Sequence, residues 1–180
     1  MSVDFDVAVI GAGVVGLATA RALAKVGKKV IVLESNKNFG QETSSRNSGV
    51  IHAGIYYDKN SLKAKTCVRG RNLLYEYLSK HKIRHNKIGK LIVANLTNSS
   101  RLEKLFFKGI ENGVEKLKIV EKQYLESFTP DVQADLAIHS PVSGILDVHG
   151  FMQSLTGEIQ DNGGDIARLS KFISAKPLAG

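Results

Sequence analysis

The stretch Asp6-Val-Ala-Val-Ile-Gly11-Ala-Gly13-Val-Val-Gly16 decides the fold of this chain. Its first five residues form a short apolar, β-branched run, which is typical of a buried parallel strand. Three glycines follow, and from Val14 apolar residues recur at helical spacing as far as Gly27. Residues 29–33 are a second apolar run. Strand, tight turn, helix and strand together predict the opening βαβ unit of a Rossmann-like α/β fold.

The three glycines and the residues between them suit a dinucleotide. Gly11 permits the tight turn, Gly13 lets the backbone approach a pyrophosphate, and Gly16 allows the helix to pack closely on the strand. The helix N-terminus at Val14 and Val15 offers unpaired N–H groups and a partial positive charge to the phosphates. The alternative is a glycine-rich turn that binds nothing.

Glu34 ends the second predicted strand, at the distance where an acid bonds a ribose hydroxyl. A carboxylate there would repel a 2′-phosphate, so the pattern favours FAD or NAD over NADP. Residues 35–60 then form a long polar stretch rich in Ser, Asn, Gly and Thr, which is typical of a ligand-contacting loop.

The remaining apolar patterns predict alternating helices and strands. In chain order they are a helix at 61–80, a strand at 90–94, a helix at 99–112, a strand at 117–120, a helix at 123–128, strands at 136–138 and 144–146, and a helix at 148–161. Ser61 is the expected N-cap of the first of these helices.

Composition bounds the function classes. The chain has 180 residues, 43% of them hydrophobic and 23% charged, close to globular averages. No apolar run approaches the roughly 18 residues of a membrane span, and residues 1–6 do not resemble a signal peptide, so we expect a cytoplasmic protein. The single cysteine, Cys67, excludes an internal disulfide and a multi-thiolate metal site. The net charge of +8 is dispersed, so we expect no nucleic-acid partner and at most peripheral membrane contact.

One segment is more specific than the glycines. Gln41-Glu-Thr43-Ser44-Ser45-Arg46-Asn47-Ser48-Gly49-Val-Ile-His52-Ala-Gly54-Ile-Tyr56-Tyr57 resembles the L-2-hydroxyglutarate dehydrogenases and oxidases, which are FAD-dependent enzymes of the D-amino-acid-oxidase type. Ser61-Leu-Lys63-Ala-Lys65, Gly89-Lys90-Leu-Ile-Val-Ala94 and Gly144-Ile-Leu-Asp147 continue the resemblance. It implies a bound FAD, oxidation of L-2-hydroxyglutarate to 2-oxoglutarate, and electron transfer to a quinone or another respiratory-chain acceptor.

The resemblance also implies a domain plan. Residues 1–80 would be the FAD-binding Rossmann-type portion, 81–147 the start of an α+β substrate domain, and 148–180 a return toward the FAD domain. The chain would then be the N-terminal half of such an enzyme, a truncated form that is inactive by itself. One side of the strand at residues 6–10 should be an uncovered edge.

Five residues of the polar loop are the expected flavin and pyrophosphate contacts. They are Thr43, Ser44, Asn47, Ser48 and Gly49, which supply short donors and one bare backbone position. The alternative is a loop in which these side chains only bond their own backbone.

His52 is the candidate catalytic residue. By resemblance it lies near the isoalloxazine, and oxidation of a 2-hydroxy acid needs a base for the hydroxyl proton. A packed structural histidine and a covalent flavin tether are the alternatives. His81 and His85 have no acidic third ligand nearby, so we interpret them as surface residues and expect no metal site.

Lys63 and Lys65 are the expected substrate contacts, together with Tyr56. Both lysines fall in the first turn of a predicted helix, where the helix dipole disfavours cations, and a dicarboxylate substrate would compensate them. The alternative is a solvated pair whose stems cover apolar surface.

Other functions remain open from the sequence. A relative that oxidises an amino acid or glycerol 3-phosphate is the nearest alternative, and an inactive fragment is another. An NAD-binding module is disfavoured by the long polar loop after Glu34.

Overall fold

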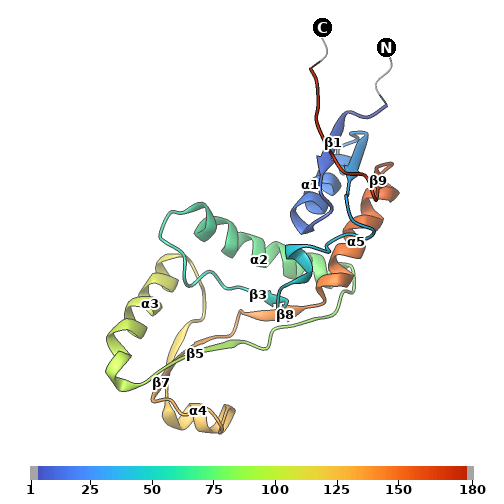
Figure 1. Cartoon of the computed structure of the whole chain (residues 1–180). Helices are drawn as coiled ribbons and strands as arrows, with labels where there is room; N and C mark the ends of the chain where they lie inside the picture. Colours follow the sequence, from blue (N-terminus) through green and yellow to red (C-terminus); the bar gives the residue numbers. More distant parts are fainter. Residues whose placement is uncertain (1–3, 178–180) are drawn as a thin grey trace. The chain divides into compact units, whose positions relative to one another are not determined.

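The computed structural model describes residues 4–177, which form two compact units (Figure 1). Unit 1 contains residues 4–48 and 147–177, and unit 2 contains residues 49–146. This division differs from the predicted boundary at residue 80. The reason is that helix α2 (Leu62–Lys80) makes its core packing and its side-chain hydrogen bonds inside unit 2.

Unit 1 is built on a three-stranded parallel sheet with the order β1-β2-β9. Its strands are β1 (Val7–Ile10), β2 (Val30–Leu33) and β9 (Asp165–Ala167). Helix α1 (Val14–Lys25) connects β1 to β2 and ends before Gly27, which has a φ of 81°. The βαβ opening predicted from the glycine-rich stretch is therefore confirmed.

Helix α5 (Val148–Asp161) packs against α1 in the same unit. Leu17 and Ala20 of α1 and Leu155 and Ile159 of α5 are buried there. Asp147 caps α5, because its Oδ1 accepts the Gly150 N–H at 2.9 Å. This helix matches the predicted range of 148–161.

The prediction that β1 is a buried strand was wrong. Its residues alternate between half-buried and exposed, and Ile10 is 52% exposed, whereas Val30 and Val32 of β2 are fully buried. The difference follows from the sheet order: within the described residues β1 pairs only with β2, while β2 lies between two strands. β1 therefore has the free edge that the sequence predicted.

Unit 2 contains two three-stranded antiparallel sheets (Figure 1). One has the order β3-β8-β4, from β3 (Val50–Ile51), β8 (Gly144–Leu146) and β4 (His85–Asn86). The other has the order β5-β7-β6, from β5 (Lys90–Ala94), β7 (Leu136–Ser140) and β6 (Lys118–Glu121). Its helices are α2, α3 (Ser99–Glu111) and α4 (Lys122–Phe128).

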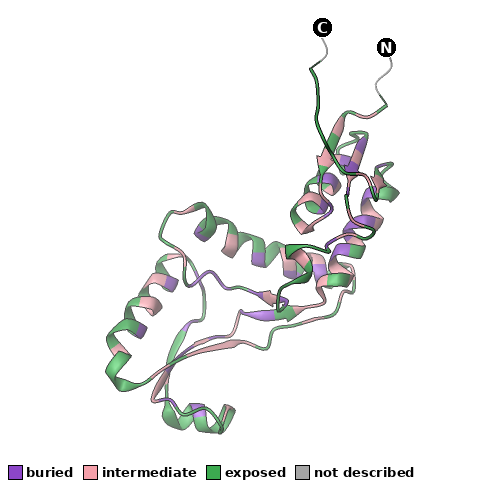
Figure 2. Ribbon diagram, viewed as in Figure 1, coloured by how far each residue is buried: buried purple, intermediate pink, exposed green. Residues whose placement is uncertain are grey.

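The main core of unit 2 joins the loop after β3 to α3 and β7. Its buried members are Ala53, Ile55, Leu102, Val114, Leu117 and Ile138. Figure 2 marks such buried residues in purple, and along α2 they recur at intervals down the helix. The buried α2 residues include Arg71, a charged side chain that is discussed below.

Several short elements were missed from the sequence. They are β3, β4 and β9 and the 3₁₀ turns η1 (Thr43–Ser45) and η2 (Leu96–Asn98). Two or three residues carry too little periodicity for a sequence pattern to detect.

Candidate functional site

The glycine-rich turn of unit 1 leaves the start of α1 open. Gly11 has a φ of 93°, which favours glycine, and its N–H donates to the Leu33 carbonyl at 2.8 Å. A Cβ on Gly16 would overlap the Gly11 carbonyl oxygen, so only glycine fits this close approach of helix and turn. Gly13 is the N-cap of α1, makes no side-chain cap, and no acid lies in the first turn. The helix end is thus suited to an anion.

Ser44 lies against this helix end. Its Oγ accepts the Val14 N–H at 3.0 Å, and a Cβ built on Gly13 would come within 3.2 Å of the same oxygen. The Asn47 Nδ2 donates to the Ser44 carbonyl at 2.8 Å, which fixes the turn η1. The structure therefore brings Gly13, Ser44 and Asn47 together at the start of α1.

The other predicted loop residues are less engaged. Thr43 and Ser48 are exposed, and so is Val15, at 76%. Gly49 has a φ of 64°, and its carbonyl accepts the Leu146 N–H at 2.9 Å inside unit 2. Contacts of Thr43, Ser48 and Gly49 with a flavin or a pyrophosphate therefore stay predictions.

Glu34 holds the turn from the end of β2. Its carboxylate accepts the Ala12 N–H and the Asn36 N–H, both at 2.8 Å, and the residue is 6% exposed. Burial alone would raise the pKa of this carboxyl, but the hydrogen bonds from Asn36, Ala12 and Ser35 outweigh it and lower the pKa. The sequence predicted that Glu34 accepts a hydrogen bond from a ribose hydroxyl, and an ionised carboxylate beside the glycine turn is suited to this role.

A cavity of about 680 Å³ opens next to Ser44 within unit 1. Sequence reasoning did not find most of its lining, in which the rings of Phe39 and His149 stack with centroids 5.3 Å apart. The lining residues are Asn38, Phe39, Gly40, Gln41, Ser44, Ser45, Asn47, Val148, His149, Met152, Gln153 and Arg168. The cavity thus joins the predicted loop contacts Ser44 and Asn47 to α5, which no local pattern linked to them.

In unit 2, His52 lies on the segment that follows β3. The side chains alternate: Ala53 and Ile55 are buried in the core, whereas His52 and Tyr56 are exposed. Within the described residues the His52 ring makes no hydrogen bond. Partial burial, and then the positive charge of Lys90, lower the pKa of His52, which favours the neutral ring.

Lys90 was not among the predicted site residues. Its Nζ lies 4.9 Å from the centre of the Tyr56 ring, and its charge acts on His52. The sequence placed Lys90 at the start of a strand, but no local pattern joined it to the residues around His52. The structure thus brings His52, Tyr56 and Lys90 together.

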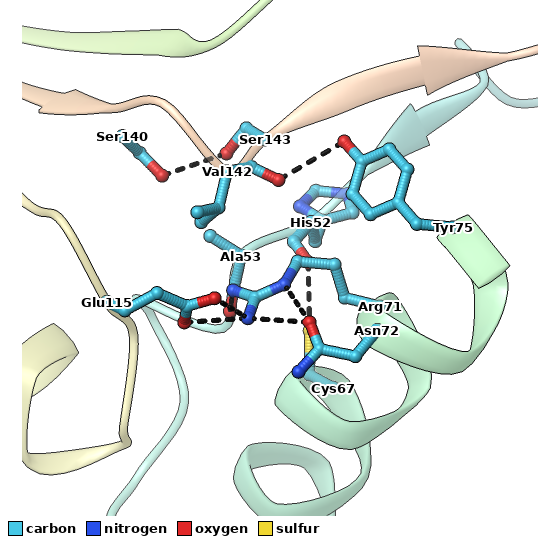
Figure 3. A network of polar contacts seen from close by, with 10 residues as sticks. All are labelled: His52, Ala53, Cys67, Arg71, Asn72, Tyr75, Glu115, Ser140, Val142 and Ser143. Carbon is cyan, nitrogen blue, oxygen red and sulfur yellow. Dashed lines mark hydrogen bonds and ion pairs between the residues drawn. The ribbon is translucent and has the colours of Figure 1, made fainter. Parts of the chain in front are cut away.

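The backbone around His52 is held by side chains from α2, which Figure 3 shows, and by Asn112 at the end of α3. The Cys67 Sγ donates to the His52 carbonyl at 3.5 Å, and the Arg71 Nη1 donates to the Ala53 carbonyl at 3.3 Å. The Asn112 Nδ2 donates to the carbonyls of Gly54, at 3.1 Å, and Tyr57, at 2.8 Å. The segment 52–57 is therefore held in place by side-chain donors and not by pairing with a neighbouring strand.

Arg71 is the centre of this network. Its side chain is 1% exposed, and its Nη2 lies 2.7 Å from both carboxylate oxygens of Glu115, which is 47% exposed (Figure 3). Its Nε and Nη2 also donate to the Asn72 Oδ1, at 3.1 and 3.0 Å. Sequence reasoning missed this residue, because a single arginine in an amphipathic helix predicts a solvated side chain.

Lys63 and Lys65 lie in the first turn of α2, as predicted. The Ser61 Oγ accepts the Ala64 N–H at 3.1 Å, which confirms the N-cap. Both lysines are exposed, and within residues 4–177 neither ammonium group forms an ion pair or contacts His52. The structure therefore does not bring them to the cluster of His52, Tyr56 and Lys90.

Comparison with known proteins gives consistent matches. A family model described as FAD dependent oxidoreductase matches residues 6–177. The chain is similar to an L-2-hydroxyglutarate dehydrogenase, mitochondrial, from Arabidopsis thaliana, with 54% identity over 153 residues that cover 83% of this chain and 31% of the relative. It is also similar to the protein of the same name from Dictyostelium discoideum, with 42% identity over 89% of this chain and 37% of the relative.

A solved structure agrees with these relatives. It is the dithionite-reduced L-alpha-glycerophosphate oxidase from Mycoplasma pneumoniae with FAD bound, with a TM-score of 0.86 and 32% identity over 92% of this chain and 44% of that one. The matched region is about a third of the length of the dehydrogenases, rather than the half that the sequence suggested. None of the helices in residues 4–177 is long and apolar enough to cross a membrane.

Proposed function

The chain belongs to the FAD-dependent oxidoreductase family, and on this premise we propose that it binds FAD and takes part in the oxidation of L-2-hydroxyglutarate to 2-oxoglutarate. The observation that carries the proposal is the open start of α1, where Gly13, Ser44 and Glu34 meet. The 54% identity to a plant L-2-hydroxyglutarate dehydrogenase supports the choice of substrate.

The residues at the start of α1 fit the diphosphate and ribose of FAD. A Cβ on Gly13 would narrow the space beside Ser44, the N-cap Gly13 has no side chain of its own to cap α1, and no acid lies in the first turn. Ser44 and Asn47 offer short polar groups for the phosphates, and the ionised Glu34 accepts hydrogen bonds from ribose hydroxyls. Thr43, Ser48 and Gly49 complete the proposed set.

His52 is the proposed base. Its ring is exposed, has no hydrogen-bond partner within the described residues, and has a lowered pKa, so the neutral ring is available to accept the hydroxyl proton of a 2-hydroxy acid. When bound, FAD would supply the two-electron oxidising chemistry. It would accept the hydrogen on the carbon that carries the hydroxyl group, together with the electron pair of that C–H bond. Tyr56, Lys63 and Lys65 are the further proposed substrate contacts.

A second candidate substrate is glycerol 3-phosphate, which the 32% identity to a glycerophosphate oxidase favours. Both substrates are anionic alcohols, so the same base would serve either. We favour the 2-hydroxy acid because the sequence identity to the dehydrogenases is higher. Oxidation rates of the flavin-loaded protein with L-2-hydroxyglutarate, glycerol 3-phosphate and glycine, each with an artificial acceptor, separate these assignments.

Electron transfer to a quinone or another respiratory-chain acceptor is part of the proposal. The net charge of +8 supports loose contact with an anionic membrane surface, where quinones are held. A cytoplasmic location stays a prediction, since the similar dehydrogenases carry mitochondrial in their names.

The flavin content of a glycine variant tests the proposed site at the start of α1. Gly13→Val places a branched side chain against Ser44, in the space that the pyrophosphate needs, and we expect the purified variant to lose its flavin absorbance. Gly157→Val is the matched control, because a Cβ there meets no atom within 4 Å and Gly157 lies in α5 of the same unit. A Gly13→Val protein with the wild-type flavin-to-protein ratio would contradict the assignment.

A further inference from the structure

Lys90 differs from the lysines of unit 2 that form ion pairs. Lys59, Lys108 and Lys122 each pair with a carboxylate, at 3.4, 2.6 and 3.7 Å. Lys90 is half-buried, its ammonium group lies over the Tyr56 ring, and it has no acidic partner within residues 4–177. A partly desolvated cation without a counter-ion attracts an anion.

The fold holds Lys90 in this place. It is the first residue of β5, where it pairs with Ser140 of β7 in a five-residue antiparallel ladder. The preceding Gly89 has a φ of 77°, and its N–H donates to the Ser143 carbonyl at 3.0 Å. The backbone that carries the ammonium group is therefore set by the sheet and its turn.

We propose that Lys90 binds a carboxylate of the substrate beside His52 and so sets the preference for an anionic 2-hydroxy acid. This inference rests on the proposed function, and it names a substrate contact that neither the glycine pattern nor the loop indicated. The occupant is a 2-hydroxy carboxylate, because its carboxylate neutralises Lys90 while the hydroxyl of the same molecule reaches the proposed base; L-2-hydroxyglutarate is the member of this class that the proposed function names.

Binding of a carboxylate to Lys90 would also change the pKa of His52. Lys90 from β5 is the cation whose charge lowers the pKa of His52, whereas Arg71 of α2 has its charge matched by Glu115. The thiol of Cys67 donates to the His52 carbonyl, and burial raises its pKa, which favours the neutral thiol. A carboxylate bound to Lys90 would offset its charge and raise the pKa of His52. The base then becomes stronger when the substrate arrives.

Lys90→Met tests the proposal, because methionine keeps an apolar chain over the Tyr56 ring and removes only the charge. Lys90→Arg keeps the charge. Lys87→Met is the matched control, since Lys87 lies 4.3 Å from the centre of the Tyr75 ring, a similar cation–π pair without effect on the pKa of His52. In a flavin-loaded full-length enzyme that contains this segment, we expect Lys90→Met to raise KM for L-2-hydroxyglutarate at least about tenfold. Lys90→Arg should restore most of this loss, and Lys87→Met should match the wild type.

The titration of His52 gives a readout that needs no turnover. With histidine-labelled protein, and with His52→Gln to assign its signal, NMR should show a higher pKa of His52 in Lys90→Met than in the wild type. Glutarate, an unreactive dicarboxylate, should raise the pKa of His52 in the wild type and in Lys87→Met but not in Lys90→Met. The acidic limb of the kcat/KM profile of Lys90→Met should accordingly move to higher pH.

The outcomes separate the two proposals. An unchanged KM in Lys90→Met, together with the same glutarate response as the wild type, overturns the role of Lys90. A full-length wild-type enzyme that holds no flavin or does not oxidise L-2-hydroxyglutarate overturns the proposed function instead. In that case the glutarate titration still decides whether Lys90 binds a carboxylate.

Discussion

Arg71→Met should destabilise unit 2 because it removes a buried cation that holds the segment around His52. The substitution keeps an apolar chain of similar length and deletes the guanidinium that donates to the Ala53 carbonyl and pairs with Glu115. A buried carbonyl left without a donor costs about 1–3 kcal/mol. Glu115 is 47% exposed and regains water, so the lost ion pair adds no more than about 1 kcal/mol. We expect a loss of about 1–4 kcal/mol in the free energy of unfolding.

The two partners should contribute unequally. Glu115→Ala leaves the guanidinium of Arg71 almost fully buried without its anion, and removal of one partner of a buried pair costs about 3–5 kcal/mol. The half-exposed position of Glu115 lets water approach, so we expect the lower end of that range. Once Arg71 is absent, Glu115 has no partner to hold, and the double variant should be no less stable than Arg71→Met alone.

Urea unfolding of the wild type, both single variants and the double variant measures this coupling. Additive losses in the double-variant cycle, or an Arg71→Met protein as stable as the wild type, would refute the role assigned to the pair. As a fold control, the far-ultraviolet circular dichroism of Arg71→Met should match the wild type before denaturant is added.

The same pair predicts a pH dependence. Burial alone would raise the pKa of the Glu115 carboxyl, but the hydrogen bonds and charge of Arg71 outweigh it, and the pKa is lowered. A carboxyl whose folded pKa is below its unfolded value contributes stability above the unfolded pKa, about 4.3, and loses it as the pH falls through the folded value. The stability difference between the wild type and Arg71→Met should therefore shrink below about pH 4. A difference that is constant down to pH 2 would contradict this.

Two further sets of substitutions test the starts of α2 and α1. Lys63→Glu and Lys65→Glu place acids in the first turn of α2, so we expect each to add about 0.3–1 kcal/mol to the free energy of unfolding. In a full-length enzyme we also expect a higher KM for the substrate and an unchanged flavin content. Kinetics equal to those of the wild type would show that the two lysines are only a solvated surface. Gly16→Ala forces a Cβ against the Gly11 carbonyl and should cost more than about 1 kcal/mol, whereas Gly157→Ala should add up to about 1 kcal/mol; thermal unfolding of both variants decides this.

The glycine turn that we propose as the dinucleotide site could be predicted from the sequence because its structural requirements are local. The turn at Gly11 needs a positive φ, the approach at Gly16 excludes any Cβ, and the acid that holds the turn ends the next strand. Each requirement limits the residue type at a fixed spacing along one βαβ unit. The hydrogen bond that the Ser44 Oγ accepts from the Val14 N–H could not be predicted, because it joins positions that only the folded loop brings together.

The burial of β1 could not be read from its composition. An apolar β-branched run indicates a strand, but the number of strands beside it decides how far it is buried, and that number depends on pairings distant in sequence. β9 is an example: it has three residues and no periodic pattern, and it nevertheless covers the second edge of β2. The sequence thus predicted whether each long element is a helix or a strand. It did not predict how exposed β1 is, because exposure depends on neighbouring strands, and strands as short as β9 carry no predictive pattern.

The surroundings of His52 show why the rest of the site lay beyond sequence reasoning. The sequence singled out the histidine by its place in the polar loop, but the features that support its proposed role as a base come from other elements. Lys90 of β5 lowers its pKa, and Arg71 of α2 and Asn112 at the end of α3 fix the carbonyls that follow it. None of these three residues stands in a pattern that distinguishes it from a solvated polar residue, because their roles are set by burial and by partners far away in the chain. Since a proton acceptor works only where its ring and its pKa are both fixed, loss of Arg71 should disturb His52 as well as stability. The His52 signal of Arg71→Met, compared at a denaturant-free pH where the variant is folded, should broaden or shift relative to the wild type; an unchanged signal would show that the core packing of Ala53 and Ile55 alone is enough to position the base.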